Sequence, residues 1–594
     1  MTIKLWQMQV EAWQPENNLT KAMEMIENTP EGWILVLPEM CIPGYMIWDR
    51  WLRDDYIKDC KSFDEDIIEA SGRKKITIVW WNIDFDETKK NEDGSIRKYN
   101  AAFIAANGKL LWKQYKTLLP NYRMFDDKRY FTSLKQLAEE EGIDIAEYYK
   151  PIETLIDGVK TKVSILICED IWNINQDYPL DPLELAKQHN PDLIVVPSAS
   201  PFWLNKSDMR RRVLENASKW TKLAYVNPIG TQNNGKNTFV FEWWSALYED
   251  GEVIEKIEDF SESTIKTKER EETEIEQIFE TTIYYIREFL ENIGLKKVVI
   301  GLSWWVDSAL SAALCTIALW KENVIAVNMP TRFNSKKTKN LAKECADRLW
   351  IDYNVISIEE NITLRVKQLY EYSNREVSSF NKENIQARER GKLLADMAWH
   401  EKAGFTNNGN KDETSVWYAT LYGDVAWALS ILADIPKVQI YELARYVNKN
   451  YWKPIPQWTI DVIPSAELSD KQDIEAWEWD PFDYEFLGKL NQAFIEKKKE
   501  PADILEMYRE GTLEDFLWLS EDILSYYENS LDFINDLEKI WKLININYFK
   551  RVQSPPIATI SKSSFWFDFR EAQNWVYYTR KYRKLKQEIL NINW

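Results

Sequence analysis

Three polar side chains near the ends of apolar runs could together cleave an amide bond. Glu39 lies in VLPEM, Lys116 in KQYKTLLP and Cys168 in SILICED. Strand ends of an α/β sheet meet at one edge, so we expect the three side chains to converge. The chain has only two histidines, which leaves a carboxylate as the base for a thiol. A lysine can stabilise the oxyanion of a tetrahedral intermediate, so the set supplies base, electrophile and nucleophile.

A second segment, VVIGLSWWVDSALSAAL, has the context of a phosphate-binding loop. An apolar strand-like run precedes the loop and a small-residue helix follows it, and the free N–H groups of a helix start bind phosphate. Such loops need glycine because their amides approach phosphate closely, yet Trp304 and Trp305 stand there. A Trp-Trp pair alone is typical of core packing. The flanking Ser303, Asp307 and Ser308 favour the phosphate loop.

The elements that would position these residues fall into two halves. Up to about residue 260, continuous apolar runs such as ILVLPEM, VSILICED and LIVVPSAS alternate with helical patterns, which predicts an α/β layered domain. A charged stretch, 261–275, suits a linker. Beyond it, residues 276–594 show βαβ periodicity that predicts a doubly wound parallel sheet, followed by an aromatic-rich helical tail.

Charge and cysteine content exclude several classes of protein. A net charge of −20 argues against binding to nucleic acid or to a membrane surface. Five scattered cysteines without a Cys-x-x-Cys spacing fit a reducing compartment, and the N-terminus has no signal core, so we expect a cytoplasmic protein. The apolar stretch 298–320 carries Asp307 in its middle and is interpreted as strand, turn and helix rather than a membrane span.

The strings LPE, KTLLPNYRMFDDKRYF, CEDIW and SASPF resemble the glutaminase domain of the nitrilase superfamily, in the form fused to glutamine-dependent NAD synthetases. The resemblance covers about residues 3–255. It implies an αββα sandwich in which Glu39 is the general base, Lys116 the oxyanion stabiliser and Cys168 the nucleophile. It also implies that glutamine is bound by Tyr122, Ser200 and Lys206.

The second half resembles the NAD synthetase domain, a PP-loop ATP pyrophosphatase with a Rossmann-like fold. The segment SWWVDS resembles the family's loop pattern Ser-Gly-Gly-x-Asp-Ser, with tryptophan at both glycines. It is followed in family order by NMPTRFNSKKT, NIQARERGKLLADMA, GNKDE, TLYGD and PSAELSDKQ. Asn408 stands where the family usually has threonine. The resemblance implies ATP-binding positions at Gly301, Leu302, Ser303, Trp304, Trp305, Val306, Asp307, Ser308 and Asn408. It implies deamido-NAD contacts at Arg388, Glu413 and Lys562, and Mg²⁺ at Asp307 and Glu413.

The activity implied by this resemblance is the ATP-dependent amidation of deamido-NAD to NAD. Glutamine supplies the ammonia, and the other products are glutamate, AMP and diphosphate. The resemblance also implies a homo-oligomer. We therefore expect a glutaminase domain over 1–260, a linker over 261–275 and a synthetase domain over 276–594.

Tryptophan stands at several positions where the family has glycine. Gly makes up about 3% of the chain against an ordinary usage of roughly 7%, whereas 29 residues are Trp. Beyond Trp304 and Trp305, the family motifs have glycine in FEWWS and at Trp350, Trp417, Trp427 and Trp566, whereas Trp172 matches a family tryptophan. We hypothesise that the source reads the codon UGA as glycine.

Two alternatives stay open at this point. If Trp304 and Trp305 are literal, the second half is an inactive pseudo-synthetase attached to a working amidase. The protein could instead be another PP-loop amidotransferase that acts on, for example, a nucleotide base, although GNKDE and SKSSF argue against this.

Overall fold

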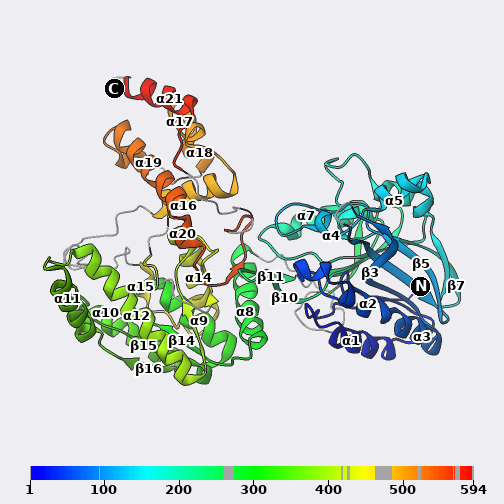
Figure 1. Ribbon diagram of the computed structural model, residues 1–594, viewed down its shortest axis with the longest axis horizontal. Helices are drawn as coiled ribbons and strands as arrows, with labels where there is room; N and C mark the ends of the chain where they lie inside the picture. Colours follow the sequence, from blue (N-terminus) through cyan, green and yellow to red (C-terminus); the bar gives the residue numbers. More distant parts are fainter. Residues whose placement is uncertain are drawn as a thin grey trace. The chain divides into compact units, whose positions relative to one another are not determined.

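The computed structural model describes residues 2–91, 94–241, 244–257, 273–416, 419–423, 429–461, 484–517, 519, 524–565, 568 and 575–591 (Figure 1). The chain divides into two compact units. The first comprises residues 1–234 and 239–271, and the second comprises 235–238 and 272–594. The expected linker, 261–275, lies mostly outside the described residues, and helix α8 already begins at Glu274.

The first unit contains two sheets. One has the order β1-β2-β3-β4-β5 and the other β13-β12-β9-β8-β7-β6. Within each, a parallel set of three strands, β1 to β3 or β7 to β9, continues into antiparallel neighbours. The strands of the first sheet are β1 (Ile3–Leu5), β2 (Ile34–Val36), β3 (Thr77–Lys90), β4 (Ile96–Ala106) and β5 (Lys109–Tyr115). Those of the second are β6 (Ile152–Ile156), β7 (Val159–Ile165), β8 (Leu193–Pro197), β9 (Lys222–Val226), β12 (Ser245–Glu249) and β13 (Glu252–Ile257).

Helices cover the outer faces of the two sheets, which gives the αββα sandwich that the sequence predicts. In Figure 1, α1 to α3 lie on one side of the unit, and α5 and α7 lie on the opposite side. Strands such as β8 are buried along their whole length because both of their faces are covered, hence their continuous apolar sequence. The helices are α1 (Pro15–Glu27), α2 (Asp54–Ser62), α3 (Asp64–Lys74), α4 (Asp127–Tyr130), α5 (Leu134–Glu141), α6 (Pro182–Lys187) and α7 (Lys206–Ala217).

The second unit is built on a parallel sheet whose strand order is β19-β18-β17-β14-β15-β16. β14 lies between β15 and β17, so the chain winds outward from it in both directions and creates a topological switch point there. This confirms the predicted doubly wound sheet. The strands are β14 (Val298–Gly301), β15 (Val324–Asn328), β16 (Asp352–Val355), β17 (Gly404–Asn407), β18 (Leu429–Ser430) and β19 (Ile557–Thr559).

A short piece of the first half also belongs to the second unit. Residues 235–238 follow strand β10 (Gly230–Asn233) and include the first two residues of β11 (Asn237–Phe241). The Ile557 N–H donates to the carbonyl of Lys236 at 2.9 Å. One edge of the sheet in the second unit is therefore formed by residues that precede helix α8 by about 40 positions in the sequence.

Helix α9 (Val306–Leu319) follows β14 and is buried along almost its entire length, between α8 (Glu274–Asn292), α10 (Lys336–Leu349) and α14 (Lys437–Asn450). This burial explains its membrane-like composition. Among the described residues, no helix has the length and apolarity needed to cross a membrane. The remaining helices that line or flank the sheet are α11 (Glu359–Ser373), α12 (Ser379–Glu401), α13 (Lys411–Val416) and α15 (Gln457–Asp461).

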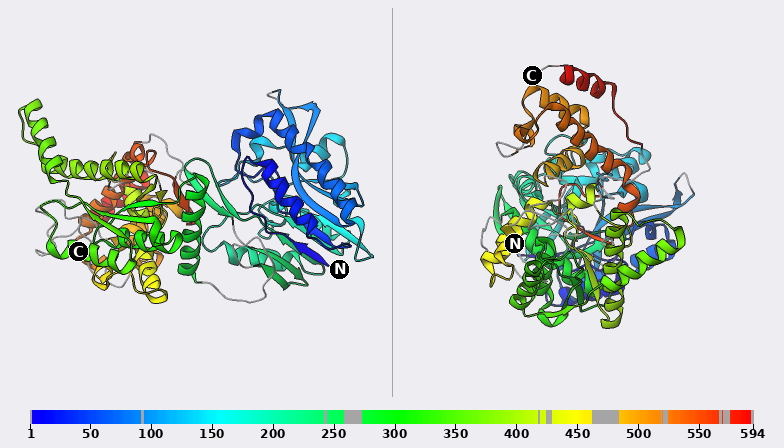
Figure 2. Two further views of the ribbon diagram at one scale, coloured as in Figure 1. Left: turned by 90° about the horizontal axis from the view of Figure 1, so that it is seen from below. Right: turned by 90° about the vertical axis from the view of Figure 1, so that its left-hand side faces the viewer.

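The C-terminal helices form a further layer with its own apolar core. They gather together on one side of the second unit, coloured orange and red in Figure 2. Phe533, Leu537 and Leu505 lie in this core. The helices are α16 (Tyr484–Asn491), α17 (Pro501–Glu510), α18 (Leu513–Leu517), α19 (Ser530–Ile546), α20 (Tyr548–Arg551) and α21 (Arg580–Asn591).

Candidate active sites

The first unit brings Glu39, Lys116 and Cys168 together at the ends of its strands. Glu39 follows β2, Lys116 follows β5 and Cys168 follows β7. All three are at most 4% exposed. Lys116 Nζ lies 2.9 Å from Glu39 Oε1. The convergence expected from the sequence thus places the predicted base and the predicted oxyanion stabiliser in direct contact.

Neighbouring polar groups fix both of these side chains. Asn100 Nδ2 donates to Glu39 Oε1 at 2.8 Å, and the Ala199 N–H donates to Glu39 Oε2 at 2.9 Å. Asp127 Oδ2 lies 2.8 Å from Lys116 Nζ. Both oxygens of the Glu39 carboxylate are therefore engaged, which holds it in one orientation beside the thiol-bearing segment.

The charge on Lys116 is secured by two carboxylates. Burial alone would lower the pKa of Lys116, but the charges of Asp127 and Glu39 outweigh it and raise the pKa well above its usual value. The two carboxylates therefore favour the protonated form of Lys116, which the predicted role of oxyanion stabiliser requires.

Cys168 occupies a strained position at a sharp turn. Its φ is 45°, in the left-handed region, and the short helix Cys168–Ile171 starts there. Strain of this kind is costly for a residue with a Cβ and is characteristic of functional sites. The carboxylate of Asp170 supports the turn because it accepts hydrogen bonds from the N–H groups of Ile167, Thr117 and Leu118 at 3.1, 3.1 and 2.8 Å.

The thiol of Cys168 is not a preformed thiolate. Burial raises its pKa, the negative charge of Glu39 raises it further, and Lys116 opposes the shift. The predicted nucleophile would therefore have to lose its proton during attack. The buried Glu39 carboxylate, whose charge acts on this thiol, is the predicted base.

The predicted glutamine-binding residues surround Cys168 in two groups. Tyr122 OH donates to the buried carboxylate of Glu169 at 3.0 Å, and Tyr178 OH donates to it at 2.7 Å. Burial raises the pKa of Glu169, while these hydroxyls and the charge of Lys116 hold it down. This buried carboxylate next to the nucleophile suits recognition of a ligand ammonium group.

Lys206 and Ser200 form the second group. Lys206 is 2% exposed, donates to the Pro201 carbonyl at 2.7 Å and lies 3.5 Å from the Trp203 ring centre. Burial lowers its pKa well below the usual value, and the nearby Arg210 guanidinium lowers it further. Arg210 also donates to Ser200 Oγ at 3.2 Å. A ligand carboxylate would fit beside these two side chains, because its negative charge would favour the protonated form of Lys206.

The second unit has a cavity of about 460 Å³ at the switch point of its sheet. The ends of β14, β15, β17 and β18 contribute Gly301, Asn328, Asn407 and Ser430 to its wall. Open α/β sheets bind ligands at this location, outside the carboxyl ends of the strands. Nine predicted residues line the cavity: Gly301, Leu302, Ser303, Trp304, Trp305, Asp307, Ser308, Asn408 and Glu413.

Hydrogen bonds between Ser303 and Ser308 join the two ends of the loop between β14 and α9. Ser303 Oγ and Ser308 Oγ lie 2.9 Å apart, and the Ser303 N–H donates to Ser308 Oγ at 3.2 Å. Trp304 is 4% exposed, with its ring centre 5.3 Å from that of Trp305 and 5.6 Å from that of Trp458. The two indoles thus stand in the wall of the cavity where a phosphate loop presents bare backbone.

Asp307 is the centre of the polar wall. It forms an ion pair with the buried Lys437 and accepts from Asn410 Nδ2 at 3.1 Å. The Asn410 N–H donates to Glu413 Oε2 at 3.4 Å, so one asparagine links both acids. Burial alone would lower the pKa of Lys437, but Asp307 and Glu413 raise it above its usual value.

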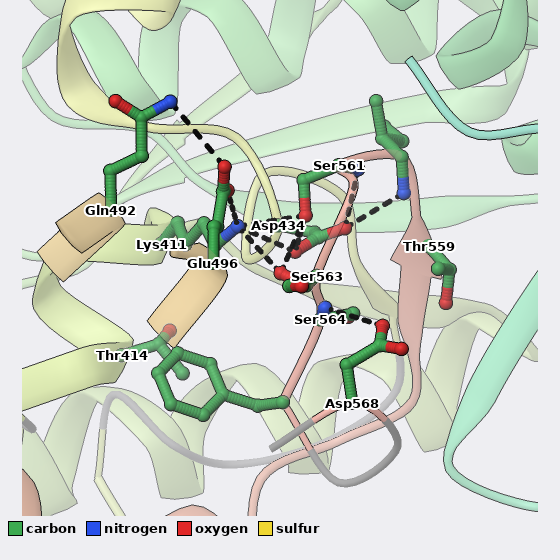
Figure 3. A network of polar contacts seen from close by, with 12 residues as sticks. Lys411, Thr414, Asp434, Gln492, Glu496, Thr559, Ser561, Ser563, Ser564 and Asp568 are labelled. Carbon is green, nitrogen blue, oxygen red and sulfur yellow. Dashed lines mark hydrogen bonds and ion pairs between the residues drawn. The ribbon is translucent and has the colours of Figure 1, made fainter. Parts of the chain in front are cut away.

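Lys411, in GNKDE, belongs to a buried network beside this wall (Figure 3). Its ammonium group lies 2.6 Å from Glu496 Oε1 and 3.5 Å from Asp434 Oδ1, and it donates to Ser561 Oγ at 2.7 Å. Asp434 Oδ2 accepts the N–H groups of Ile560 and Ser561, each at 2.8 Å. The network fastens the GNKDE and SKSS strings to each other.

Three predicted residues lie outside the cavity lining given by the described residues. Val306 is buried at the start of α9. Arg388 is exposed and donates to the Leu421 carbonyl at 3.2 Å, and Lys562 is exposed between two serines of the Lys411 network. Their predicted ligand contacts stay predictions. PSAELSDKQ and the tryptophans Trp243, Trp417, Trp427 and Trp566 lie outside the described residues.

The structure adds five residues that the sequence analysis did not assign. Asp127 and Glu169 stand inside the strings FDDKRYF and CEDIW, so a signal existed for them. Lys437 had none, because nothing in DIPKVQIY distinguishes a site lysine from a surface lysine. The other two, Asn100 and Asn410, orient carboxylates.

Comparison with known proteins assigns a family to each half of the chain. Residues 2–268 match the carbon-nitrogen hydrolase family, and residues 278–514 match the NAD synthase family. The glutamine-dependent NAD(+) synthetase of Thermotoga maritima is 30% identical over 546 residues, which cover 82% of this chain and 88% of that protein. The one from Acinetobacter baylyi is 29% identical over 571 residues, covering 92% and 94%.

Solved structures agree over the full length. The glutamine-dependent NAD+ synthetase from Acinetobacter baumannii in complex with ADP has a TM-score of 0.66 at 25% identity and covers 95% of this chain and 96% of that one. The enzyme from Cytophaga hutchinsonii has a TM-score of 0.74 at 18% identity over 99% of both chains, a similarity of fold.

A carbon-nitrogen hydrolase unit joined to an α/β unit of the NAD synthase family defines a glutamine amidotransferase of the ligase class. The chain belongs to the glutamine-dependent NAD(+) synthetase family.

Proposed function

We propose that this chain makes NAD from deamido-NAD, with ATP as the energy source and glutamine as the nitrogen donor. The observation that carries the proposal is the buried Glu39–Lys116–Cys168 set in one unit, together with a cavity at the sheet switch point of the other. Family membership supplies the particular substrates.

In the first unit, Cys168 Sγ attacks the side-chain carbonyl carbon of glutamine while Glu39 accepts the thiol proton. Lys116 stabilises the oxyanion that forms. Glu39 then gives its proton to the leaving nitrogen, and ammonia departs from a thioester. Water, deprotonated by Glu39, attacks the thioester and releases glutamate and the thiol.

The polar groups around Cys168 would hold the two ends of the amino acid. Glu169, with its two tyrosine hydroxyl partners, faces the α-amino group, and the cationic group of Lys206 and Arg210 attracts the α-carboxylate. The side-chain amide is thereby aimed at the thiol.

In the second unit, the carboxylate of the nicotinate ring attacks the α-phosphorus of ATP and diphosphate leaves. Ammonia then attacks the acyl carbon of the adenylate, and AMP leaves as the nicotinamide forms. Ser303, Ser308 and the N–H groups at the start of α9 would hold phosphate oxygens, with Lys437 near them.

Asp307 and Glu413 fit Mg²⁺ because both acids line the cavity and Asn410 links them. Mg²⁺ is commonly held by one or two carboxylates plus substrate phosphates, and there it would neutralise phosphate charge.

A product assay with protein from the native source tests the proposal. We expect NAD, AMP, diphosphate and glutamate in equal amounts from deamido-NAD, ATP and glutamine. Formation of AMP and diphosphate with a different acceptor, but not with deamido-NAD, would contradict it and favour an amidotransferase for another substrate. We further expect a cytoplasmic homo-oligomer, which fractionation and sedimentation would test.

The packed indoles of Trp304 and Trp305 favour one second candidate, a glutaminase whose synthetase half is inactive. Its signature is glutamate release from glutamine with no binding of ATP to the native protein. The residue identity at these two positions decides between the candidates.

A further inference from the structure

We infer that the tryptophans at positions 13, 48, 220, 320 and 350 occupy glycine positions of the fold, and that the native protein carries glycine there and in the phosphate loop at 304 and 305. Four of the five lie outside every sequence motif considered above. The first part rests on backbone conformation alone. The loop part also rests on the proposed function.

The five residues share a positive φ. The values are 68° for Trp13, 51° for Trp48, 70° for Trp220, 67° for Trp320 and 54° for Trp350. A side chain with a Cβ is strained there, and a bulky residue in this region is a genuine outlier. Glycine adopts these values without cost.

The other large aromatic residues of the same chain provide an internal control. The chain has 29 Trp, 29 Tyr and 23 Phe. Among the described residues with positive φ, five are Trp, one is a tyrosine (Tyr422) and none is Phe. General distortion of the backbone would affect the three types alike. The excess of positive φ values is therefore specific to tryptophan and is not a general property of aromatic residues.

Two of the positions are helix C-caps. Trp350 ends α10 with φ 54° and ψ 31°, the same left-handed cap that Gly142 and Gly511 form after α5 and α17. Trp320 ends α9 with φ 67° and ψ 151°, a combination found essentially only in glycine.

Exposure removes the usual reason to accept such strain. Trp220 is 91% exposed and Trp320 is 74% exposed. Their indoles therefore gain little from packing that could offset the backbone cost.

Other tryptophans of the chain are buried and make the packing and hydrogen-bond contacts that are usual for an indole. Trp51 is 2% exposed and packs edge-on against Phe131 at 5.2 Å. Trp80 is fully buried, and its Nε1 donates to Asp64 Oδ1 at 2.8 Å. The two sets of tryptophans differ in backbone φ, as one codon-reading rule that acts on part of the tryptophans would produce.

The loop positions rest on the proposed function and not on φ, since Trp305 has a φ of −71°. Trp304 and Trp305 line the cavity between Ser303 and Asp307, where ligand phosphate must approach backbone N–H groups. Glycine at both positions opens the wall of the cavity and leaves Ser303, Ser308 and Asp307 in place.

Peptide mass spectrometry of the protein purified from its native source is the test. We expect glycine at positions 13, 48, 220, 304, 305, 320 and 350, and tryptophan at 51 and 80. Tryptophan at the five positive-φ positions overturns the inference. Glycine at these five but tryptophan at 304 and 305 overturns its loop part.

Recombinant variants provide a second, independent readout. In protein made with tryptophan throughout, Trp320→Gly and Trp350→Gly should each raise the thermal unfolding midpoint, whereas the matched control Trp51→Gly should lower it. A lower midpoint in all three variants contradicts the conformational argument.

ATP binding separates this inference from the proposed function. Trp304→Gly/Trp305→Gly protein should bind ATP in calorimetry at least tenfold more tightly than the tryptophan form. If native peptides contain glycine but the double variant binds no ATP, the residue assignment stands and the proposed function fails. If native peptides contain tryptophan at these positions and the double variant binds no ATP, the residue assignment and the proposed function both fail.

Discussion

At the scale of single residues, each buried charge among Glu39, Lys116 and Asp127 in the amidase site has a partner of opposite charge. Lys116 is shared between Glu39 and Asp127, and the side chains of both acids are buried. The three main residues could be predicted because the strings around them resemble those of a known family. Their place at strand ends is a weak signal by itself, and β5 before Lys116 is mostly exposed. Asn100, on the adjacent strand β4, carries no such signal, because an asparagine inside a strand acquires meaning only when β4 pairs with β3.

The raised pKa of the Cys168 thiol predicts the pH dependence of its alkylation. Burial and the Glu39 charge stabilise the protonated form, so the thiolate fraction keeps rising as pH increases beyond 9. The rate of iodoacetamide modification of the free enzyme should therefore increase throughout pH 6–9 without a plateau. A plateau near neutral pH would show a preformed thiolate and contradict the concerted role of Glu39.

Glu39→Gln should separate reactivity from catalysis. Removing the carboxylate charge lowers the pKa of the Cys168 thiol, so alkylation at pH 8 should become faster. Glutaminase kcat should nevertheless fall by about 10²–10⁴-fold because the base is lost. Glu31→Gln, on the exposed surface of the same unit, is the control and should change neither. Slower alkylation together with lower kcat would indicate general disruption of the site.

Lys437 is expected to act in the synthetase reaction only. Lys437→Met removes a buried cation beside the phosphate loop and leaves Asp307 without its ion-pair partner. With glycine at 304 and 305, NAD formation should fall by about 10²–10³-fold, as for loss of one charge-stabilising donor. Glutamine hydrolysis should be unchanged. The exposed Lys449→Met variant, on the same helix, should be silent in both assays.

At the scale of elements, the strand–loop–helix unit from β14 to α9 and the parallel order around it could be predicted from the apolar runs. The edge of the sheet could not. β18 has two residues and β19 three, too few for any periodicity, and residues 235–238 come from the other half of the chain. These elements are held by long-range contacts, which local sequence does not encode.

The Asp434 network should determine the stability of that edge. Asp434→Ala leaves two buried N–H groups and Lys411 with fewer partners, at a cost of about 1–3 kcal/mol for each unsatisfied group. We expect a lower unfolding midpoint and a higher KM for ATP, because Ala433 and Ser430 line the cavity next to it. Asp352→Ala, exposed on β16, is the control. An unchanged midpoint would show that the network is dispensable.

At the scale of the whole molecule, two chemistries are built on two units with separate cores. Length and composition indicated the number of domains and the depleted glycine, and the alternation of apolar runs with helical patterns indicated the α/β class. It could not indicate which tryptophans matter, since that depends on φ at each position. The backbone separates the left-handed tryptophans from those that pack in the core.

The division of labour between the two units is the central claim, and Cys168→Ala tests it most directly. In protein with glycine at 304 and 305, the rate of NAD formation should be measured with glutamine and, separately, with ammonium chloride. Cys168→Ala should abolish the glutamine-supported rate and keep the ammonia-supported rate. The buried Cys345→Ala control should keep both. Equal loss of both rates in Cys168→Ala would contradict the account.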